Sequence, residues 1–179
     1  MSHKEKTVKS TPIYNGKIFD VFLDEVEVEN GGIYPREVIY HNGAVAILAI
    51  SNNDEIYLVK QYRYPIKEEI YEIPAGKLEN NEQPIDCAIR ELEEETGMKA
   101  TNFSYLGKMY PSPGCLSEII YLYLATNLEK SEQNLDVDEF INVECIPMSQ
   151  VLDMIMEEKI VDAKSQLAIL KYLTITNKE

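Results

Sequence analysis

The 179-residue sequence predicts an α/β fold (α+β) in which mixed β-sheets lie between helices. Most of the chain consists of short runs of β-branched and aromatic residues separated by turn residues, which is typical of strands. Helical spacing of apolar residues occurs over residues 84–96, 149–157 and 163–174. Strands and helices therefore follow one another in mixed order. A chain of this length can form one domain with a sizeable core and a small appendage.

The N-terminal part predicts a β-hairpin that follows a loose leader. Residues 1–12 are expected to be the leader. Strand-like runs over residues 17–29 and 33–40 flank a turn at Asn30, Gly31 and Gly32. Because a lone hairpin is marginally stable in water, we expect it to pack on the main domain or on another subunit.

The middle of the chain predicts the main strands. Residues 43–50 are an almost continuous apolar run, as in a buried strand, and a turn leads to a strand over residues 55–62, so that the two form a second hairpin. Residues 126–138 are polar and loop-like, and Asp162 is a suitable N-cap for the last helix. Further strands are expected over residues 69–73, 103–109, 119–125 and 140–146.

The helix predicted over residues 84–96 is the most informative segment. Pro84 suits a first helical turn, and Gly97 suits the position just past the C-terminus. Residues 76–98, which contain this helix, hold six Glu and one Asp around a single Arg90. The apolar stripe of the helix comprises Ile85, Ala88, Ile89 and Leu92.

Three carboxylates of this helix, those of Glu91, Glu94 and Glu95, share one surface because their positions are three and four residues apart. A solvated acidic face is the alternative, but a soluble helix usually mixes charges. Here no Lys lies between Lys77 and Lys99, and acidic residues in the last turn oppose the helix dipole. The pattern favours a functional cluster, whose oxygen ligands suit Mg²⁺ or Mn²⁺.

The spacing of these residues resembles the Nudix box of the Nudix hydrolase family. The matching positions are Gly76, Glu82, Arg90, Glu91, Leu92, Glu94, Glu95, Gly97 and Met98, in the pattern G-x5-E-x7-R-E-U-x-E-E-x-G-U with U apolar. The resemblance implies hydrolysis of a nucleoside diphosphate linked to another group. It also implies a Nudix-type α/β/α sandwich over residues 43–179, with the N-terminal leader and strands in residues 1–42 as a separate subdomain.

The resemblance also implies roles for the box residues. Glu91, Glu94 and Glu95 would bind the metal, together with the backbone carbonyl of Ala75, and Glu94 would also contribute to catalysis. An Arg among carboxylates more often orients them than contacts a substrate, so we interpret Arg90 and Glu82 as organisers of the site. Gly76 is expected to turn the loop, and Gly97 to end the helix.

Residues outside the box resemble the ADP-ribose pyrophosphatase subgroup. The acidic run 135–140 is similar to the loop that supplies a general base in that subgroup, which favours Glu139 with Asp136 as the second choice; an acidic surface loop is the alternative. Pro113 begins a P-G-x-x-x-E pattern that is similar to a downstream signature of the subgroup, and Glu118 would then face the substrate or its metals. An ordinary Pro-Gly turn is the alternative there.

Two arginines are candidates for binding a diphosphate. Arg63 lies at the end of a predicted strand and Arg36 in the N-terminal hairpin, and a guanidinium can clamp phosphates bidentately. Surface ion pairs are the alternative for both. The resemblance further implies a homodimer in which the N-terminal strands of one subunit complete the site of the other. The need of the hairpin for a surface to pack on agrees with this.

Composition limits the partners. The chain carries 17 basic and 31 acidic residues, a formal net charge of −14, which disfavours nucleic acid. No apolar run approaches the roughly 18 residues of a membrane span, and the N-terminus lacks an apolar signal core. Three Cys without metal-type spacing indicate free thiols and a cytoplasmic protein.

The sequence thus predicts an Mg²⁺-dependent hydrolase, with Mn²⁺ as the alternative ion, that splits ADP-ribose into AMP and ribose 5-phosphate. The nucleoside diphosphate sugar is the expected partner, with no nucleic acid and no membrane. Two alternatives stay open: a Nudix activity on another nucleoside diphosphate sugar or related nucleotide, and a non-catalytic Nudix domain that binds a regulatory ligand.

Overall fold

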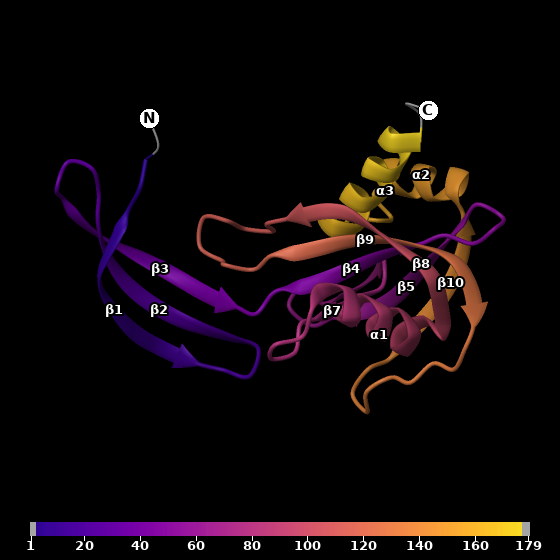
Figure 1. The fold of residues 1–179 in the computed structure, drawn as a ribbon, viewed down its shortest axis with the longest axis horizontal. Helices are drawn as coiled ribbons and strands as arrows, with labels where there is room; N and C mark the ends of the chain where they lie inside the picture. Colours follow the sequence, from indigo (N-terminus) through magenta and orange to yellow (C-terminus); the bar gives the residue numbers. More distant parts are fainter. Residues whose placement is uncertain (1–2, 177–179) are drawn as a thin grey trace. The chain divides into compact units, whose positions relative to one another are not determined.

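The computed structural model describes residues 3–176, and these divide into two compact units. One unit takes in the chain through Gly43 together with Tyr110–Ile119, and the other holds Ala44–Met109 and the chain from Ile120 onward. Figure 1 shows the ribbon with its helices and strands labelled.

The first unit is built on a three-stranded antiparallel sheet in the order β1-β2-β3. The predicted hairpin is confirmed as β2 (Phe19–Glu27) and β3 (Ile33–His41). The prediction of a loose leader over residues 1–12 is wrong for residues 6–12, because these lie in β1 (Lys6–Asn15). Residues 1–2 lie outside the described residues. β1 is an exposed edge strand of mostly polar residues, so it lacks the alternation that marks a half-buried strand.

The segment 110–119 belongs to this unit through its contacts with β3. The N–H of Ile39 donates to the carbonyl of Cys115 at 2.7 Å, and the N–H of Ser117 donates to the carbonyl of Ile39 at 2.9 Å. The N–H of His41 donates to Oγ of Ser117 at 3.0 Å. A segment that lies between two strands of the second unit in sequence is thus attached to the first unit.

The second unit contains two sheets. One is four-stranded in the order β7-β4-β9-β8, with β4 and β9 parallel, and the other is antiparallel in the order β10-β5-β6. The strands are β4 (Ala44–Ala49), β5 (Glu55–Arg63), β6 (Glu68–Glu72), β7 (Ala75–Lys77), β8 (Met98–Met109), β9 (Ile120–Lys130) and β10 (Ile141–Pro147).

Two expectations for these strands are wrong. The predicted second hairpin does not form, because β4 and β5 lie in different sheets and only an isolated bridge joins Ile50 to Ile56. Both edges of β4 are already occupied, by β7 and β9. The expected loop over residues 126–138 begins later, since β9 continues to Lys130.

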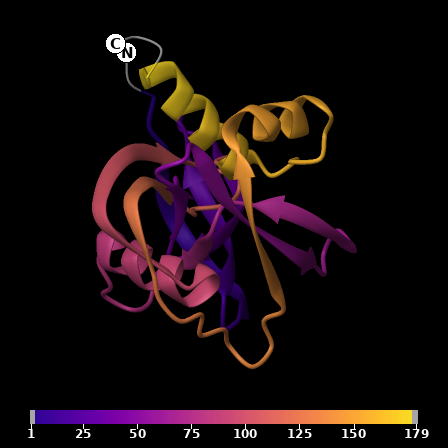
Figure 2. The same cartoon turned by 90° about the vertical axis from the view of Figure 1, so that its right-hand side faces the viewer.

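The helices α1 (Pro84–Thr96), α2 (Met148–Met156) and α3 (Ala163–Thr176) cover this unit on two sides (Figure 2). Alternate residues of the fully buried β4 belong to two cores. Val45, Ile47 and Ala49 pack with Ala88 and Leu92 of α1. Ala44, Ala46 and Leu48 face the core formed with the second sheet, α2 and α3, which includes Ile56, Leu58, Val151, Ala168 and Ile169. The predicted mixed α/β sandwich is confirmed.

The box helix α1 forms as predicted, with one change in its buried face. Gly97 is the C-cap in the left-handed conformation (φ 66°), and its N–H donates to the carbonyl of Glu93. Ile89, expected in the apolar stripe, is 45% exposed, whereas Cys87 is buried in the core beside Ala88. Between residues 3 and 176 no helix has the length and apolar character to cross a membrane.

Candidate active site

The site begins where the chain crosses from one sheet to the other. Strand β7 pairs with β4 and places Gly76 against the carboxylate of Glu91 on α1. A Cβ built on Gly76 would overlap that carboxyl group, so only glycine permits this close approach. We expected Gly76 to turn a loop, but it lies inside β7. The close approach of Glu91 is what requires a glycine at this position.

Glu95 is the most deeply buried carboxylate of the box. Its side chain is 4% exposed, and its Oε2 accepts a hydrogen bond from the N–H of Ala75 at 2.9 Å. The pKa of Glu95 is raised to about 8, chiefly by burial and also by the nearby charges of Glu91 and Glu139, against the opposing hydrogen bond from Ala75. A nearby cation would stabilise the charged form of this carboxylate strongly.

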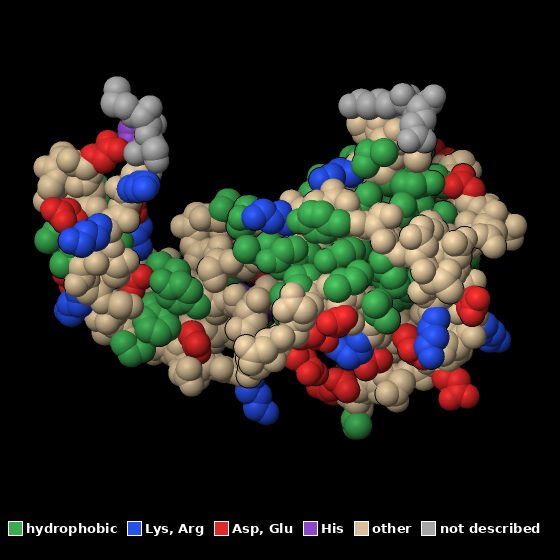
Figure 3. All heavy atoms as spheres, in the orientation of Figure 1, with side chains coloured by type: hydrophobic (Ala, Val, Ile, Leu, Met, Phe, Trp, Pro, Cys, Tyr) green, Lys and Arg blue, Asp and Glu red, His purple; other side chains and the backbone are tan. Residues whose placement is uncertain are grey.

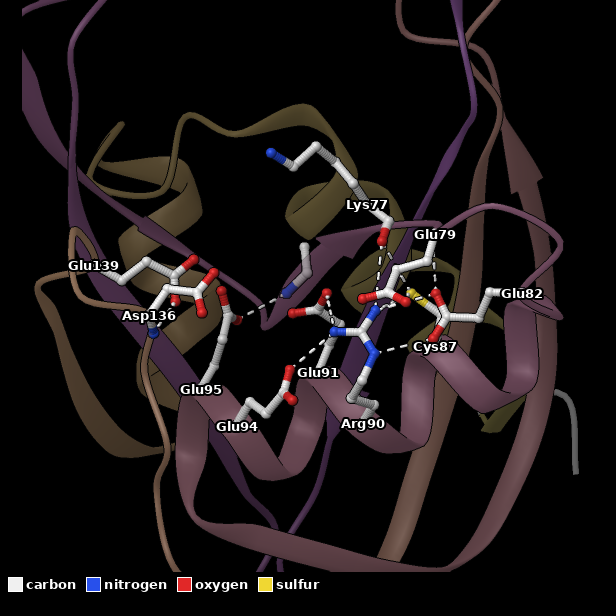
Figure 4. Close-up of polar contacts among 11 residues, drawn as sticks. Lys77, Glu79, Glu82, Cys87, Arg90, Glu91, Glu94, Glu95, Asp136 and Glu139 are labelled. Atoms are coloured by element: carbon white, nitrogen blue, oxygen red, sulfur yellow. Dashed lines mark hydrogen bonds and ion pairs between the residues drawn. The ribbon is translucent and has the colours of Figure 1, made fainter. Parts of the chain in front are cut away.

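Arg90 lies at the centre of the other carboxylates (Figure 4). Its Nε and Nη2 atoms donate to the two oxygens of Glu82 at 2.9 and 3.1 Å. Its Nη1 atom donates to Glu91 and to Glu94, both at 2.8 Å. The hydrogen bonds from Arg90 hold the pKa of Glu82 at about 2, so that Glu82 remains an anion. Arg90 thus contacts three box carboxylates at once, and the organising role of Arg90 and Glu82 stays a prediction.

Glu91 combines a buried position with a cationic neighbour. Burial raises the pKa of Glu91, Arg90 opposes that rise, and the charges of Glu94 and Glu139 add to it. Acidic side chains gather around one basic side chain on this part of the surface in Figure 3. The box thus holds more negative charge than Arg90 can neutralise by itself.

The donor types fit a hard divalent cation, although the ligands do not yet converge. Carboxylate and carbonyl oxygens are the ligands that Mg²⁺ and Mn²⁺ take in proteins. Within the described part of the chain, no three His, Cys, Asp or Glu side chains are already close enough together to hold a metal ion. Glu91 and Glu94 both accept from Nη1 of Arg90, and their role as metal ligands with Glu95 and Ala75 stays a prediction.

The acidic loop between β9 and β10 lies on the Glu95 side of the cluster. Figure 4 shows Asp136 and Glu139 near Glu95, and the negative charge of Glu139 is one cause of the raised pKa of both Glu91 and Glu95. Oε2 of Glu139 accepts a hydrogen bond from the N–H of Asp136 at 3.2 Å. The structure therefore brings both candidate bases near the box carboxylates, while the choice between them stays a prediction.

Both candidate arginines already contact carboxylates. Nε and Nη2 of Arg63 donate to Glu72 at 2.5 and 2.7 Å, and the field of Arg63 reaches Glu95. In the first unit, Nε and Nη2 of Arg36 donate to Glu5 at 3.0 and 2.5 Å. Their roles toward a diphosphate stay predictions.

The other predicted substrate residues, Pro113 and Glu118, belong to the first unit, whereas the box belongs to the second. Oε1 of Glu118 lies 3.6 Å from Nδ1 of His41, and that nitrogen accepts a hydrogen bond from the N–H of Gly43 at 2.9 Å. The role of both residues in substrate binding stays a prediction.

Sequence reasoning missed a polar cluster behind the site. Glu72 is 1% exposed and contacts both Arg63 and Lys164, while Ser165 is fully buried. The available signal was a Glu between Tyr71 and Ile73, two residues before Pro74, since a carboxylate buried among such residues needs partners. Nothing local in the sequence identified Lys164 or Ser165, whose contacts with Glu72 and Ile73 each span 92 residues.

Comparisons with known proteins agree with this geometry. Residues 40–167 match the NUDIX domain family, and residues 5–39 match the nucleoside diphosphate sugar hydrolase N-terminal domain. A protein named methanol dehydrogenase activator from Bacillus methanolicus is 42% identical over 96% of this chain and 94% of its own. A protein named ADP-ribose pyrophosphatase from Bacillus subtilis is 41% identical over 97% of this chain and 95% of its own.

A solved structure described as an ADP compounds hydrolase shares the fold. Its TM-score is 0.88, with 21% sequence identity, over 98% of this chain and 95% of that one. The intact box, the fold and the matches over nearly the whole length lead to one assignment. The chain belongs to the Nudix family and is a Nudix hydrolase.

Proposed function

We propose that the protein hydrolyses the diphosphate of ADP-ribose to AMP and ribose 5-phosphate. The observation that carries the proposal is the gathering of the box carboxylates at the Ala75–Gly76 strand, with Glu95 bound to Ala75 and Glu91 packed on Gly76. Support for the substrate comes from the Bacillus subtilis relative, which is named ADP-ribose pyrophosphatase and matches nearly the full length of both chains.

Nudix hydrolases generally need divalent metal ions, and we infer Mg²⁺ as the ion here. Glu91, Glu94, Glu95 and the carbonyl of Ala75 would hold it, with Mn²⁺ as the alternative. A bound divalent ion supplies charge neutralisation of the phosphate oxygens and a lowered pKa of a coordinated water. Arg90 and Glu82 keep Glu91 and Glu94 in place beside that position.

The remaining roles rest on the resemblance of the sequence and, for the base, on the acidic loop near Glu95. Glu139 accepts the proton of the attacking water, with Asp136 as the second choice, because both lie in the loop beside Glu95. Arg63, Arg36, Pro113 and Glu118 contact the substrate, the arginines through its diphosphate.

We propose a homodimer formed through the N-terminal strands. The first unit exposes many large apolar side chains, and monomers rarely leave such surface uncovered. The exposed side chains are those of Val8, Ile13, Tyr14, Ile18, Phe19, Leu23, Ile33, Tyr34 and Tyr40. Light scattering should give twice the monomer mass of 20.5 kDa, and a monomer at working concentration would contradict the proposal.

We propose that the protein is located in the cytoplasm. Cys87, Cys115 and Cys145 are all free thiols, which suits a reducing compartment. Fractionation of cells into cytosol, membrane and exported fractions tests this placement, and recovery of the protein outside the cytosol would contradict it.

A second candidate function is activation of an alcohol dehydrogenase. It is favoured by the Bacillus methanolicus relative, which is named methanol dehydrogenase activator and is 42% identical over 96% of this chain. The assay is the rate of a methanol dehydrogenase with and without this protein. A rate increase that Glu95→Gln abolishes would assign the activation to the same carboxylates.

The proposed function is tested by a panel of nucleoside diphosphate derivatives with Mg²⁺, in which the phosphate products are resolved. GDP-mannose belongs in the panel because proteins named GDP-mannose pyrophosphatase, such as that of Enterobacter sp., are also similar, with 32% identity over 83% of this chain. We expect the highest kcat/KM for ADP-ribose, with AMP and ribose 5-phosphate as products. A clear preference for another substrate would overturn the assignment.

A further inference from the structure

We propose that the N-terminal turn of α3, through Asp162, Lys164 and Ser165, is a positioning device for the peptide that carries Ala75 into the active site. None of these three residues belongs to the predicted site. The inference rests on the proposed function only in that Ala75 and Glu95 are assigned to the metal site.

The peptide between β6 and β7 lacks the partners that a sheet would give it. The chain leaves one sheet at Glu72 and enters the other at Ala75. Pro74 has no N–H, and its carbonyl accepts a hydrogen bond from the N–H of Ile47 at 2.8 Å. The two N–H groups of this crossing, those of Ile73 and Ala75, therefore depend on side chains.

Two side chains from different elements bind these two groups. The N–H of Ile73 donates to Oγ of Ser165 at 2.8 Å, and the N–H of Ala75 donates to Oε2 of Glu95 at 2.9 Å. One comes from α3 and the other from α1. The crossing peptide is thus held by side chains from both helices. The α3 contact is made at Ile73, two residues before Ala75, whose N–H donates to Glu95.

Ser165 is itself fixed by a second contact. It is fully buried, and its hydroxyl donates to Oδ2 of Asp162 at 2.5 Å, so its oxygen is oriented to accept from Ile73. Asp162 also accepts from the N–H of Ser165 at 3.0 Å, which caps α3 as the sequence predicted. The cap therefore links the start of the helix to the crossing peptide.

Lys164 holds the residue that begins the crossing. Its Nζ atom donates to Oε2 of Glu72 and lies 3.0 Å from Oδ1 of Asp162. The Glu72 carboxylate is almost fully buried and also binds Arg63. Loss of Lys164 would leave this buried anion with one cation, so Glu72 and the peptide after it would shift to find other partners.

The consequence is specific to the metal site. A buried N–H without a partner is costly, so removal of the Ser165 hydroxyl would let Ile73 and Pro74 move. A displacement of about 1 Å at a reacting centre can reduce a rate by roughly 100-fold. Ser165 and Lys164 would thus act on catalysis through Ala75 without contacting substrate or metal.

The test uses Ser165→Ala and Lys164→Met, with Lys164→Arg as the conservative variant and Thr174→Val as a matched control. Thr174 lies on the same helix and is exposed, and its hydroxyl donates to the carbonyl of Leu170. For each variant we would measure kcat, KM, the Mg²⁺ concentration at half-maximal rate, and Tm. The assay uses whichever nucleotide of the panel the wild type hydrolyses best, so failure of ADP-ribose as the substrate does not affect it.

We expect Ser165→Ala and Lys164→Met to lower kcat by roughly 10-fold or more and to raise the Mg²⁺ requirement, with KM nearly unchanged. Lys164→Arg should restore most of the loss, and Thr174→Val should behave like the wild type. Direct binding of Mn²⁺, followed by electron paramagnetic resonance, should weaken in the two damaging variants. A lowered Tm with unchanged kcat and unchanged Mn²⁺ binding would overturn the proposal, because the turn would then only stabilise the fold.

Discussion

Gly76 and Glu91 are in direct contact: the carboxylate of Glu91 occupies the space that a Cβ on residue 76 would fill. The glycine lies in β7 and the carboxylate on α1, so the contact determines where the Glu91 carboxylate can lie against the strand. A larger residue at position 76 would therefore displace the Glu91 carboxylate.

Gly76→Ala should lower turnover by roughly 100-fold, because the added methyl group displaces the Glu91 carboxylate from its place against β7. The variant should still fold, with circular dichroism like that of the wild type and a lower Tm. Steady-state hydrolysis of ADP-ribose measures the effect. Wild-type kcat in this variant would mean that the position of Glu91 does not matter for turnover.

Glu95→Gln should lower turnover by at least roughly 100-fold and abolish the rise in Tm that Mg²⁺ gives the wild type, because it removes a metal ligand. Glu93→Gln is the matched control. Glu93 lies on the same helix but contacts Ser131 and Lys99, so its loss should change turnover little. Equal turnover in Glu95→Gln and the wild type would refute the metal assignment.

The identity of the general base is tested by two substitutions in one loop. Glu139→Gln should reduce kcat strongly, whereas Asp136→Asn should retain most of the rate. Rates from pH 5 to 9 make the comparison. The opposite ranking would assign the base to Asp136.

Glu72 should make the protein sensitive to acid. Burial alone would raise the pKa of Glu72, but hydrogen bonds and charge from Arg63 and Lys164 outweigh it and hold the pKa below its ordinary value of 4.5. Because the folded pKa is depressed, the stabilisation is present above pH 4.5 and is lost as the pH falls through the folded value.

The measurement is Tm as a function of pH for the wild type and for Glu72→Gln. The wild type should have the higher Tm at pH 7, and the difference should shrink below pH 4.5. A difference that does not change with pH would show that the charge of Glu72 does not stabilise the fold.

The helix α1 could be predicted from the sequence because its signals are local: helical spacing, Pro84 at its start, Gly97 after its end, and a box of fixed spacing. The burial of Cys87 in place of Ile89 could not be predicted, because it depends on how far the helix is rotated about its axis against the sheet. Local periodicity defines a stripe only to within about one residue on either side.

Strand pairing was predicted less well because it is decided by distant partners. The sequence predicted a hairpin of β4 and β5. In the structure β4 pairs with β9, whose residues lie about 75 positions later in the chain. The contact between Ser165 and Ile73 likewise spans 92 residues. No nearby residue indicates such contacts, so the predicted site lacked its supporting cluster.

The central claim is that these carboxylates carry out metal-dependent cleavage of ADP-ribose. Its most direct test is the rate of AMP formation from ADP-ribose as Mg²⁺ is titrated into metal-free protein. We expect no turnover without the ion, saturable activation by Mg²⁺, and equal amounts of AMP and ribose 5-phosphate. Turnover that persists in a chelator, or none at saturating Mg²⁺, would contradict it.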